Sequence, residues 1–90
     1  MCALEKNRLA SCQITYFPVK STQYIDDIYK VLDIIKSYPV EQEVGILSTT
    51  IRGDAETVFK LIKDIFDTMG NQGCNFTLDI MISNICGCQI

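Results

Sequence analysis

Two stretches with helical periodicity, each enclosed by stretches in which apolar and polar residues alternate, constrain the fold of this chain most. Apolar residues recur every three or four positions in residues 24–35 and again in residues 58–69. This spacing places the apolar side chains on one side of an α-helix, whereas alternation places them on one face of a β-strand. The alternating segments are residues 12–18, 40–44, 46–52 and 74–83.

Turn and capping residues separate these segments. The hydroxyl groups in residues 20–23 are expected to cap the first helix, and Pro39 is expected to end it. Gly45 permits a hairpin turn between the second and third strands. Gly53 is expected to break the third strand, after which the Asp54 carboxylate caps the second helix.

The resulting order of elements, βαββαβ, predicts an α+β, ferredoxin-like sandwich in which both helices cover one face of an antiparallel sheet. Right-handed crossovers lead us to expect the first and last strands in the centre of the sheet. The helix-covered face should carry Ile14, Tyr16, Phe76, Leu78, Ile80 and Ile82. The other face should carry Gln13, Thr15, Phe17, Thr77, Asp79 and Met81, a mixed surface suited to pairing with a second copy.

The length and composition predict one globular domain. Ninety residues, 48% of them hydrophobic, are enough for a single core but not for two. We expect residues 1–11 to be a flexible lead-in and residues 12–90 to form the domain. The net charge of −3 argues against nucleic acid as a partner, because binding it requires a concentrated basic face. No apolar run is long enough for a signal sequence or a membrane span, so we expect a cytoplasmic protein without a membrane partner.

The residue types present argue against an enzyme. The chain contains no histidine, so no Ser–His or Cys–His pair can form. It also contains no glycine-rich phosphate loop. Its five cysteines are an odd number and match no familiar disulfide framework, which favours reduced thiols. Cys86 and Cys88 could hold a soft metal, but a tetrahedral site would need further, distant cysteines. We therefore expect no catalytic residue, no metal and no cofactor.

Thr49 occupies a position where alternation predicts an apolar side chain. It shares a face of its predicted strand with Leu47 and Ile51, whereas Ser48 lies on the opposite face. The apolar neighbours indicate that this face is covered by the helices. A threonine there must find a hydrogen-bond partner or bear a cost of about 1–3 kcal/mol. Either the Thr49 hydroxyl forms a hydrogen bond with nearby backbone, or it forms one with a ligand in a pocket that the Tyr16 ring could line.

The combination of two motifs resembles the thiamine/hydroxymethylpyrimidine-binding YkoF family. The first is "CQITYFPV", residues 12–19, followed by a helix; the second is "STTIRGDAETVF", residues 48–59, which opens another helix. The likeness covers nearly the whole domain. It implies a ferredoxin-like domain that binds thiamine or its hydroxymethylpyrimidine moiety without chemistry, in salvage or transport of thiamine precursors. Some members of the family carry two such domains in tandem, so this single domain is expected to form a homodimer or a homotetramer.

The resemblance suggests which side chains would meet the ligand. The hydrogen-bonding edge of an aminopyrimidine suits hydroxyl and amide groups, its faces suit aromatic rings, and the thiazolium cation of thiamine suits a carboxylate. The candidate ligand-binding residues are Thr49, Ser48, Tyr16, Gln13, Phe17 and Asp79, with Thr49 first. Gln13, Phe17 and Asp79 are predicted on the face opposite Thr49. The six can line one pocket only if it wraps a sheet edge or spans a subunit boundary.

Two other functions remain open at this stage. A regulatory or oligomerisation module similar in outline to ACT domains would bind a different small metabolite on the same fold. A soft-metal carrier would use Cys86 and Cys88 instead of the sheet.

Overall fold

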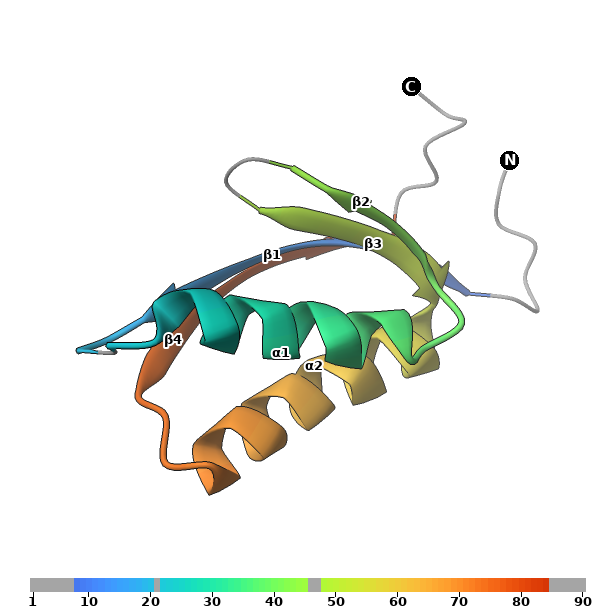
Figure 1. The fold of residues 1–90 in the computed structure, drawn as a ribbon. Coiled ribbons are helices and arrows are strands. Elements are labelled where there is room, and N and C mark those ends of the chain that lie inside the picture. The colour runs from blue at the N-terminus through green and yellow to red at the C-terminus, as the bar shows by residue number, and fades with distance from the viewer. Residues whose placement is uncertain (1–7, 21, 46–47, 85–90) are drawn as a thin grey trace.

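The fold consists of two layers, a four-stranded antiparallel sheet and two helices that both lie on one of its faces (Figure 1). The structure, a computed structural model, describes residues 8–20, 22–45 and 48–84. Its elements are β1 (Leu9–Pro18), α1 (Tyr24–Lys36), β2 (Glu41–Val44), β3 (Thr49–Asp54), α2 (Ala55–Asn71) and β4 (Phe76–Ser83). The predicted ferredoxin-like βαββαβ architecture is therefore confirmed.

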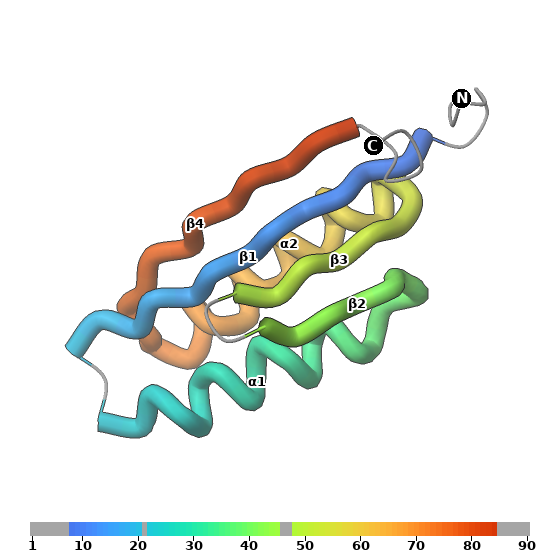
Figure 2. Tube along the Cα trace, turned by 90° about the horizontal axis from the view of Figure 1, so that it is seen from above, coloured from blue at the N-terminus to red at the C-terminus, as the bar shows by residue number. Residues whose placement is uncertain are grey.

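The strands follow the order β2-β3-β1-β4, so β1 and β3 occupy the centre of the sheet (Figure 2). The prediction that the last strand lies in the centre was wrong, because β4 forms an edge. The crossover through α1 carries the chain from β1 to a place two strands away, and the β2–β3 hairpin then fills the gap. The crossover through α2 passes β1 and leaves β4 on its free side. Both crossovers can be right-handed in this order as well.

The register of β1 confirms the predicted division of the sheet into two faces. Ile14 pairs with Thr49 of β3 and with Ile80 of β4, and these residues share the helix-covered face. Gln13 pairs with Thr50 and with Met81, and these share the open face. Along β4, half-buried residues alternate with exposed ones as far as Ile80, as expected for a strand covered on one side only.

The first strand begins at Leu9, so residues 9–11, expected in the flexible lead-in, belong to the sheet. Ala10 is buried, and it pairs with Gly53. Gly53 does not break β3, as had been expected, but lies within it. A β-carbon at Gly53 would lie 2.8 Å from Cγ1 of Val40, which is closer than such contacts allow. Glycine therefore permits a close approach of β3 to the chain that enters β2.

The two helix starts differ from each other. Asp54 caps α2 as predicted, its carboxylate accepting from the backbone N–H groups of Glu56 at 3.1 Å and Thr57 at 3.4 Å. The predicted hydroxyl cap of α1 was wrong, because its N-cap is Gln23, whose side chain makes no capping hydrogen bond. Since α1 begins at Tyr24, the hydroxyl of Thr22 comes one position too early to cap it.

The core lies between the sheet and both helices. Its buried apolar residues are Ala10, Cys12, Ile14, Val31, Ile35, Ile51, Ala55, Val58, Leu61, Ile65 and Met69. Asp27 of α1 is a charged residue, yet it is only 6% exposed. Its carboxylate lies beside Cys74, with 3.9 Å between Cys74 Sγ and Asp27 Oδ1. The segment that leads into β4 therefore covers the first turns of α1.

Candidate functional site

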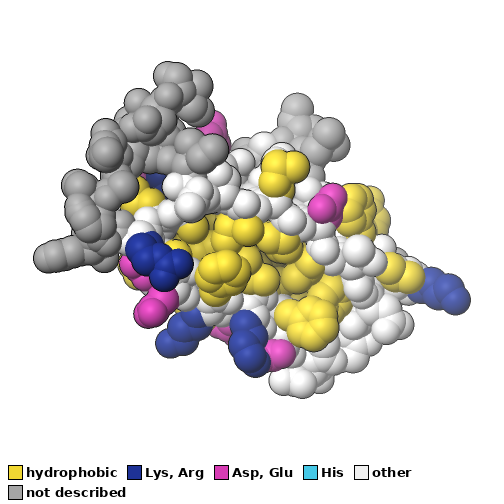
Figure 3. Space-filling view, turned by 180° about the vertical axis from the view of Figure 1, so that it is seen from behind, with side chains coloured by type: hydrophobic (Ala, Val, Ile, Leu, Met, Phe, Trp, Pro, Cys, Tyr) yellow, Lys and Arg dark blue, Asp and Glu magenta, His cyan; other side chains and the backbone are white. Residues whose placement is uncertain are grey.

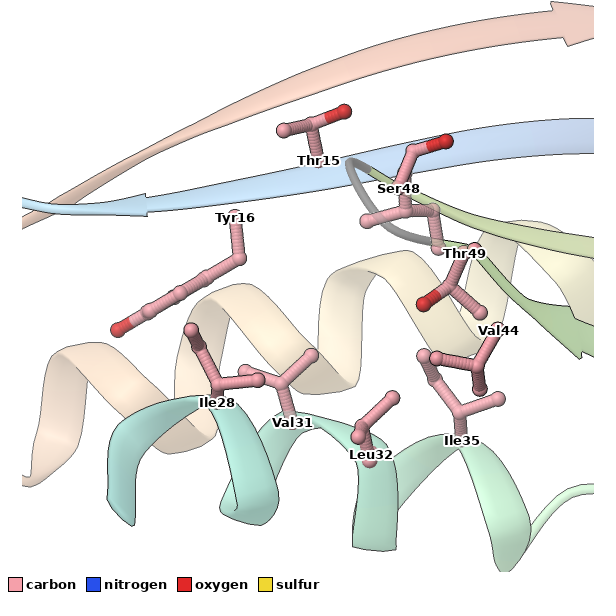
Figure 4. Close-up of a pocket in the computed structure, with 11 residues that line it drawn as sticks. Thr15, Tyr16, Ile28, Val31, Leu32, Ile35, Val44, Ser48 and Thr49 are labelled. Carbon is pink, nitrogen blue, oxygen red and sulfur yellow. The ribbon is translucent and has the colours of Figure 1, made fainter. Parts of the chain in front are cut away.

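A pocket of about 120 Å³ opens between α1 and the part of the sheet formed by β1 and the β2–β3 hairpin (Figure 4). The sheet supplies its upper side and α1 supplies its floor. It is lined by Ile14, Thr15, Tyr16, Ile28, Val31, Leu32, Ile35, Val44, Gly45, Ser48 and Thr49. The predicted sheet–helix pocket beside Thr49 is therefore present.

Thr49 is a polar residue on an otherwise apolar wall of this pocket. It is 8% exposed, and its hydroxyl points into the space above α1 (Figure 4). Within the residues that the structure describes, this hydroxyl forms no hydrogen bond. The neighbouring backbone therefore does not satisfy it, which leaves the hydroxyl available to a bound molecule.

Tyr16 is among the residues that line the pocket, and its hydroxyl is buried. The ring stacks on Phe76 at a centroid distance of 5.2 Å. The buried hydroxyl has no hydrogen-bond partner in the described part of the chain. Burial, with smaller electrostatic contributions from the neighbouring Cys74 and Asp27, raises the pKa of Tyr16 to about 12. Tyr16 can therefore serve the pocket as an aromatic wall rather than as a hydrogen-bonding group.

Replacing Tyr16 by phenylalanine is expected to raise the free energy of unfolding by about 1 kcal/mol at pH 7, because a buried hydroxyl without a partner is removed. The raised pKa also has a consequence at high pH. Below pH 10 both states keep the proton, but between pH 10 and about 12 only the unfolded state loses it, so stability falls as pH rises. Urea unfolding at pH 7 and pH 10.5 measures both effects. A Tyr16→Phe protein that is less stable at pH 7, or that loses as much stability as the wild type on going to pH 10.5, would contradict this account.

Ser48 and Gln13 are joined to each other on the open face of the sheet. The Gln13 amide donates to Ser48 Oγ at 2.9 Å. Ser48 borders the pocket, but its hydroxyl points away from α1 (Figure 4). Phe17, 48% exposed, and Asp79 also lie on the open face. The six predicted residues therefore form two groups on opposite faces, as the alternation indicated, and only Thr49 and Tyr16 present their side chains to the pocket.

The walls contributed by α1 and by the hairpin were missed at the level of the sequence. Ile28, Val31, Leu32 and Ile35 follow ordinary core spacing, so nothing in the pattern separates a pocket wall from a packed core. Val44 falls in the predicted strand 40–44, for which no ligand role was predicted. Ile28 and Val44 remain 37% and 55% exposed, which places them at the mouth of the pocket.

Among the described residues that line this pocket, none has a charged side chain. Its polar groups are hydroxyls and the backbone of the hairpin, where Gly45 N–H donates to Ser48 O at 2.8 Å. A buried charge needs a partner of opposite sign, and this lining supplies none. The pocket is therefore suited to a neutral, largely apolar group that can make one or two hydrogen bonds.

Metal ligation finds no support in the part of the chain that the structure describes, where no group of three Cys, Asp or Glu side chains could hold an ion. Cys12 and Cys74 are free thiols, and burial raises the pKa of Cys12 to about 11. Cys86 and Cys88, the candidates for a soft metal, lie outside the described residues. Neither described helix is long and apolar enough to cross a membrane.

Comparison with known proteins identifies the family. The model of the YkoF-related family matches residues 9–89, almost the entire chain. The chain belongs to the YkoF-related family. The resemblance inferred from the two motifs is thus confirmed, and the match begins at Leu9, where β1 begins. No curated protein sequence matches the chain.

Solved structures share the fold of this YkoF-related domain at low sequence identity. A Thermotoga maritima protein assigned provisionally to thiamine biosynthesis or salvage is 22% identical, with a TM-score of 0.77 over 90% of this chain and 92% of that one. A Streptococcus pneumoniae protein is 19% identical, with a TM-score of 0.80 over 91% and 92% of the two chains. A Bacillus cereus domain of unknown function is 16% identical, with a TM-score of 0.77 over 94% and 84%. At these identities the structures support the fold alone.

Proposed function

We propose that this YkoF-related protein binds hydroxymethylpyrimidine, or thiamine through its pyrimidine moiety, and does so without catalysis. The observation that carries the proposal is the hydroxyl of the buried residue Thr49, which points into a mostly apolar pocket and forms no hydrogen bond within the described residues. An aminopyrimidine has donors and acceptors in its plane and apolar faces above and below. Thr49 would meet the edge, while Tyr16 and the α1 side chains would cover the faces.

The size and charge of the pocket favour the free pyrimidine over the whole of thiamine. Its volume of about 120 Å³ is well below the ~300–1,000 Å³ of pockets for drug-sized ligands, so it suits a single ring. The thiazolium ring of thiamine carries a permanent positive charge, and the described residues that line the pocket include no carboxylate. Thiamine would therefore place its pyrimidine inside and its thiazolium at the mouth, beside Ile28 and Val44. We expect hydroxymethylpyrimidine to bind more tightly.

The same features argue against the ACT-like alternative. A free amino acid would bring an ammonium and a carboxylate into a pocket whose described lining residues offer no side chain of opposite charge. We expect no binding of amino acids. A titration with a mixture of free amino acids separates the two functions.

The wider role we propose is salvage or transport of thiamine precursors in the cytoplasm. It is supported by the assignment of the Thermotoga maritima relative, whose fold the chain shares, and by family membership. The open-face residues Gln13, Ser48, Phe17 and Asp79 are not needed for the pyrimidine pocket. They remain candidates for contacts across a subunit boundary.

Replacing Thr49 by valine, which is nearly the same size, is expected to weaken binding of hydroxymethylpyrimidine by about 1–3 kcal/mol, roughly 5- to 150-fold. The reason is that the ligand loses its hydrogen-bond partner while the apolar walls stay in place. Isothermal titration calorimetry of the purified protein with hydroxymethylpyrimidine and with thiamine measures the change. Thr50→Val is the matched control, because Thr50 is the next residue of β3 and is exposed on the opposite face.

Two results would overturn the proposal. If neither compound produces heat or a thermal shift at millimolar concentration, the ligand class is wrong. If both bind but Thr49→Val and Thr50→Val behave alike, the ligand is held elsewhere, and the open-face group becomes the first place to look.

A further inference from the structure

A buried carboxylate lies one helical turn beyond the pocket floor. The buried residues of α1 are Asp27, Val31 and Ile35, which are spaced four positions apart and therefore form one row along the helix. Val31 and Ile35 line the pocket, and Asp27 is the next position of the same row toward the start of α1. Charged residues are rarely buried this fully, at 6% exposure, unless they have a role. The row that supplies the pocket floor thus continues to a carboxylate.

Tyr16 lies between Asp27 and the pocket. Its side chain stands at the end of the pocket opposite Thr49, and its hydroxyl points away from Thr49 (Figure 4). The hydroxyl is buried, and Asp27 and Cys74 are close enough to contribute to the raised pKa of Tyr16. The Tyr16 ring therefore has the pocket on one side and the Asp27 carboxylate on the other.

The space that the Tyr16 ring fills has the shape of a slot for a flat aromatic ring. Phe76 of β4 forms one wall, because the two rings stack with a centroid distance of 5.2 Å and an interplanar angle of 26°. At the inner end Cys74 Sγ lies 3.9 Å from Asp27 Oδ1. We call this space the ring slot, bounded by Phe76, Cys74 and Asp27. It accommodates a ring that carries a polar substituent at one end.

The wall of the ring slot is supported from outside. Phe66 of α2 contacts Phe76 edge-on, with 5.6 Å between the ring centroids. Seen from the β4 side, hydrophobic side chains gather in a broad band across the middle of the molecule (Figure 3). Phe76 can therefore keep its position when the ring stacked on it changes.

Tyr16 is an imperfect occupant of the ring slot. Its hydroxyl has no hydrogen-bond partner in the described part of the chain, although a carboxylate acceptor is nearby. A buried hydroxyl without a partner carries a desolvation cost. Turning the side chain to another staggered rotamer would return the hydroxyl to water and clear the slot. The loss of stacking on Phe76 would be partly offset in this way.

We propose that the Tyr16 side chain is displaced by the ligand, whose ring enters the ring slot and donates from an amino group to the Asp27 carboxylate. Asp27 would then select rings that bear an amino group. An ionised carboxylate accepts hydrogen bonds and donates none, so it disfavours a ring with an oxo group at the same position. This inference rests on the proposed function and deepens it, because it assigns the amino edge of an aminopyrimidine to Asp27.

The arrangement of polar groups along the enlarged site matches such a ligand. Thr49 lies at one end of the pocket and Tyr16 at the other, so a ring in the slot would extend toward Thr49 (Figure 4). Between the two ends, α1 presents the apolar side chains of Ile28 and Val31. A site with two polar ends and an apolar middle suits a flat base whose polar groups lie on its edge.

The first experiment compares two ligands that differ in one group. Calorimetric titration uses hydroxymethylpyrimidine and its analogue in which an oxo group replaces the amino group. The wild-type protein should bind the amino compound at least ~10-fold more tightly. In Asp27→Asn the side-chain amide both donates and accepts, so this ratio should fall to about one. Asp26→Asn is the matched control, because Asp26 is the preceding residue of α1, carries the same charge and is exposed.

The second experiment tests displacement of the Tyr16 ring. Tyr16→Phe removes the unpartnered hydroxyl and so favours the occupied slot, which should lower the affinity for hydroxymethylpyrimidine about 5-fold. Tyr29→Phe is the control, since Tyr29 is 62% exposed on α1. NOEs between the ring protons of Tyr16 and Phe76 should be present in the free protein and disappear when it is saturated with ligand. These measurements also decide the matter if Asp27→Asn fails to fold by circular dichroism.

The outcomes distinguish this inference from the proposed function. If the wild-type protein does not bind hydroxymethylpyrimidine, both are wrong. If it binds the amino and oxo compounds equally, or if Asp27→Asn keeps the wild-type ratio, Asp27 does not select the ligand. If Tyr16→Phe keeps full affinity and the NOEs to Phe76 persist in the complex, Tyr16 is a fixed wall. Either of the last two results overturns the inference and leaves the pocket beside Thr49 as the proposed site.

Discussion

Replacing Leu61 by alanine is expected to lower the free energy of unfolding by about 2–5 kcal/mol. Leu61 is fully buried in the middle of α2 and packs in the core between the helices and the sheet. Truncating it removes apolar contacts and leaves a cavity that a close-packed core fills only in part. A domain of this size has a total stability of about 5–15 kcal/mol, so a large share would be lost.

Urea unfolding followed by circular dichroism at one fixed protein concentration measures this loss. Ile25→Ala is the control, because Ile25 is an apolar residue of α1 that is 54% exposed and does not line the pocket. We expect the control to cost less than about 1 kcal/mol. Equal losses in the two variants would mean that the core is not where the structure places it.

Replacing Ile28 by tryptophan is expected to weaken binding of hydroxymethylpyrimidine by at least ~100-fold, or about 2.7 kcal/mol. Ile28 stands at the mouth of the pocket, beneath the Tyr16 ring and 37% exposed (Figure 4). An indole there would occupy most of a space of about 120 Å³. Because the position is open to solvent on one side, the larger side chain need not strain the core, and the melting temperature should change by only a few degrees.

The same calorimetric titration used for Thr49 provides the measurement, and Ile25→Trp is its control. Ile25 lies one turn earlier on α1 and makes no wall of the pocket. Full affinity in Ile28→Trp would show that the ligand does not enter between α1 and the sheet. A loss of affinity in Ile25→Trp alone would point to a site over the first turn of α1.

Local patterns in the chain were enough to predict most elements of the fold. In β1 and β4 the apolar residues alternate, and in α1 and α2 they follow helical spacing. Each pattern shows which side of the element packs against the core, and it can be recognised from the residues of that segment alone. The Asp54 cap was predicted for the same reason, since it acts on backbone groups only two and three residues away. Gly53 shows the limit of such reasoning. Its role depends on Val40, thirteen positions earlier in the chain. The local sequence therefore predicts the end of a strand at Gly53, although the residue lies inside β3.

For the candidate site, the sequence by itself determined that Thr49 is a polar residue on a buried face and that Gln13, Phe17 and Asp79 lie on the other. Strand alternation carries that information because its period is two. Only the tertiary structure decided that Ser48 bonds to Gln13, that Asp27 is buried beside Cys74, and that Ile28 and Val44 open a pocket instead of closing a core. It also decided that β4 lies at an edge of the sheet. These features depend on how far α1 stands from the hairpin and on which strand pairs with which, and both are set by contacts between segments distant in the chain.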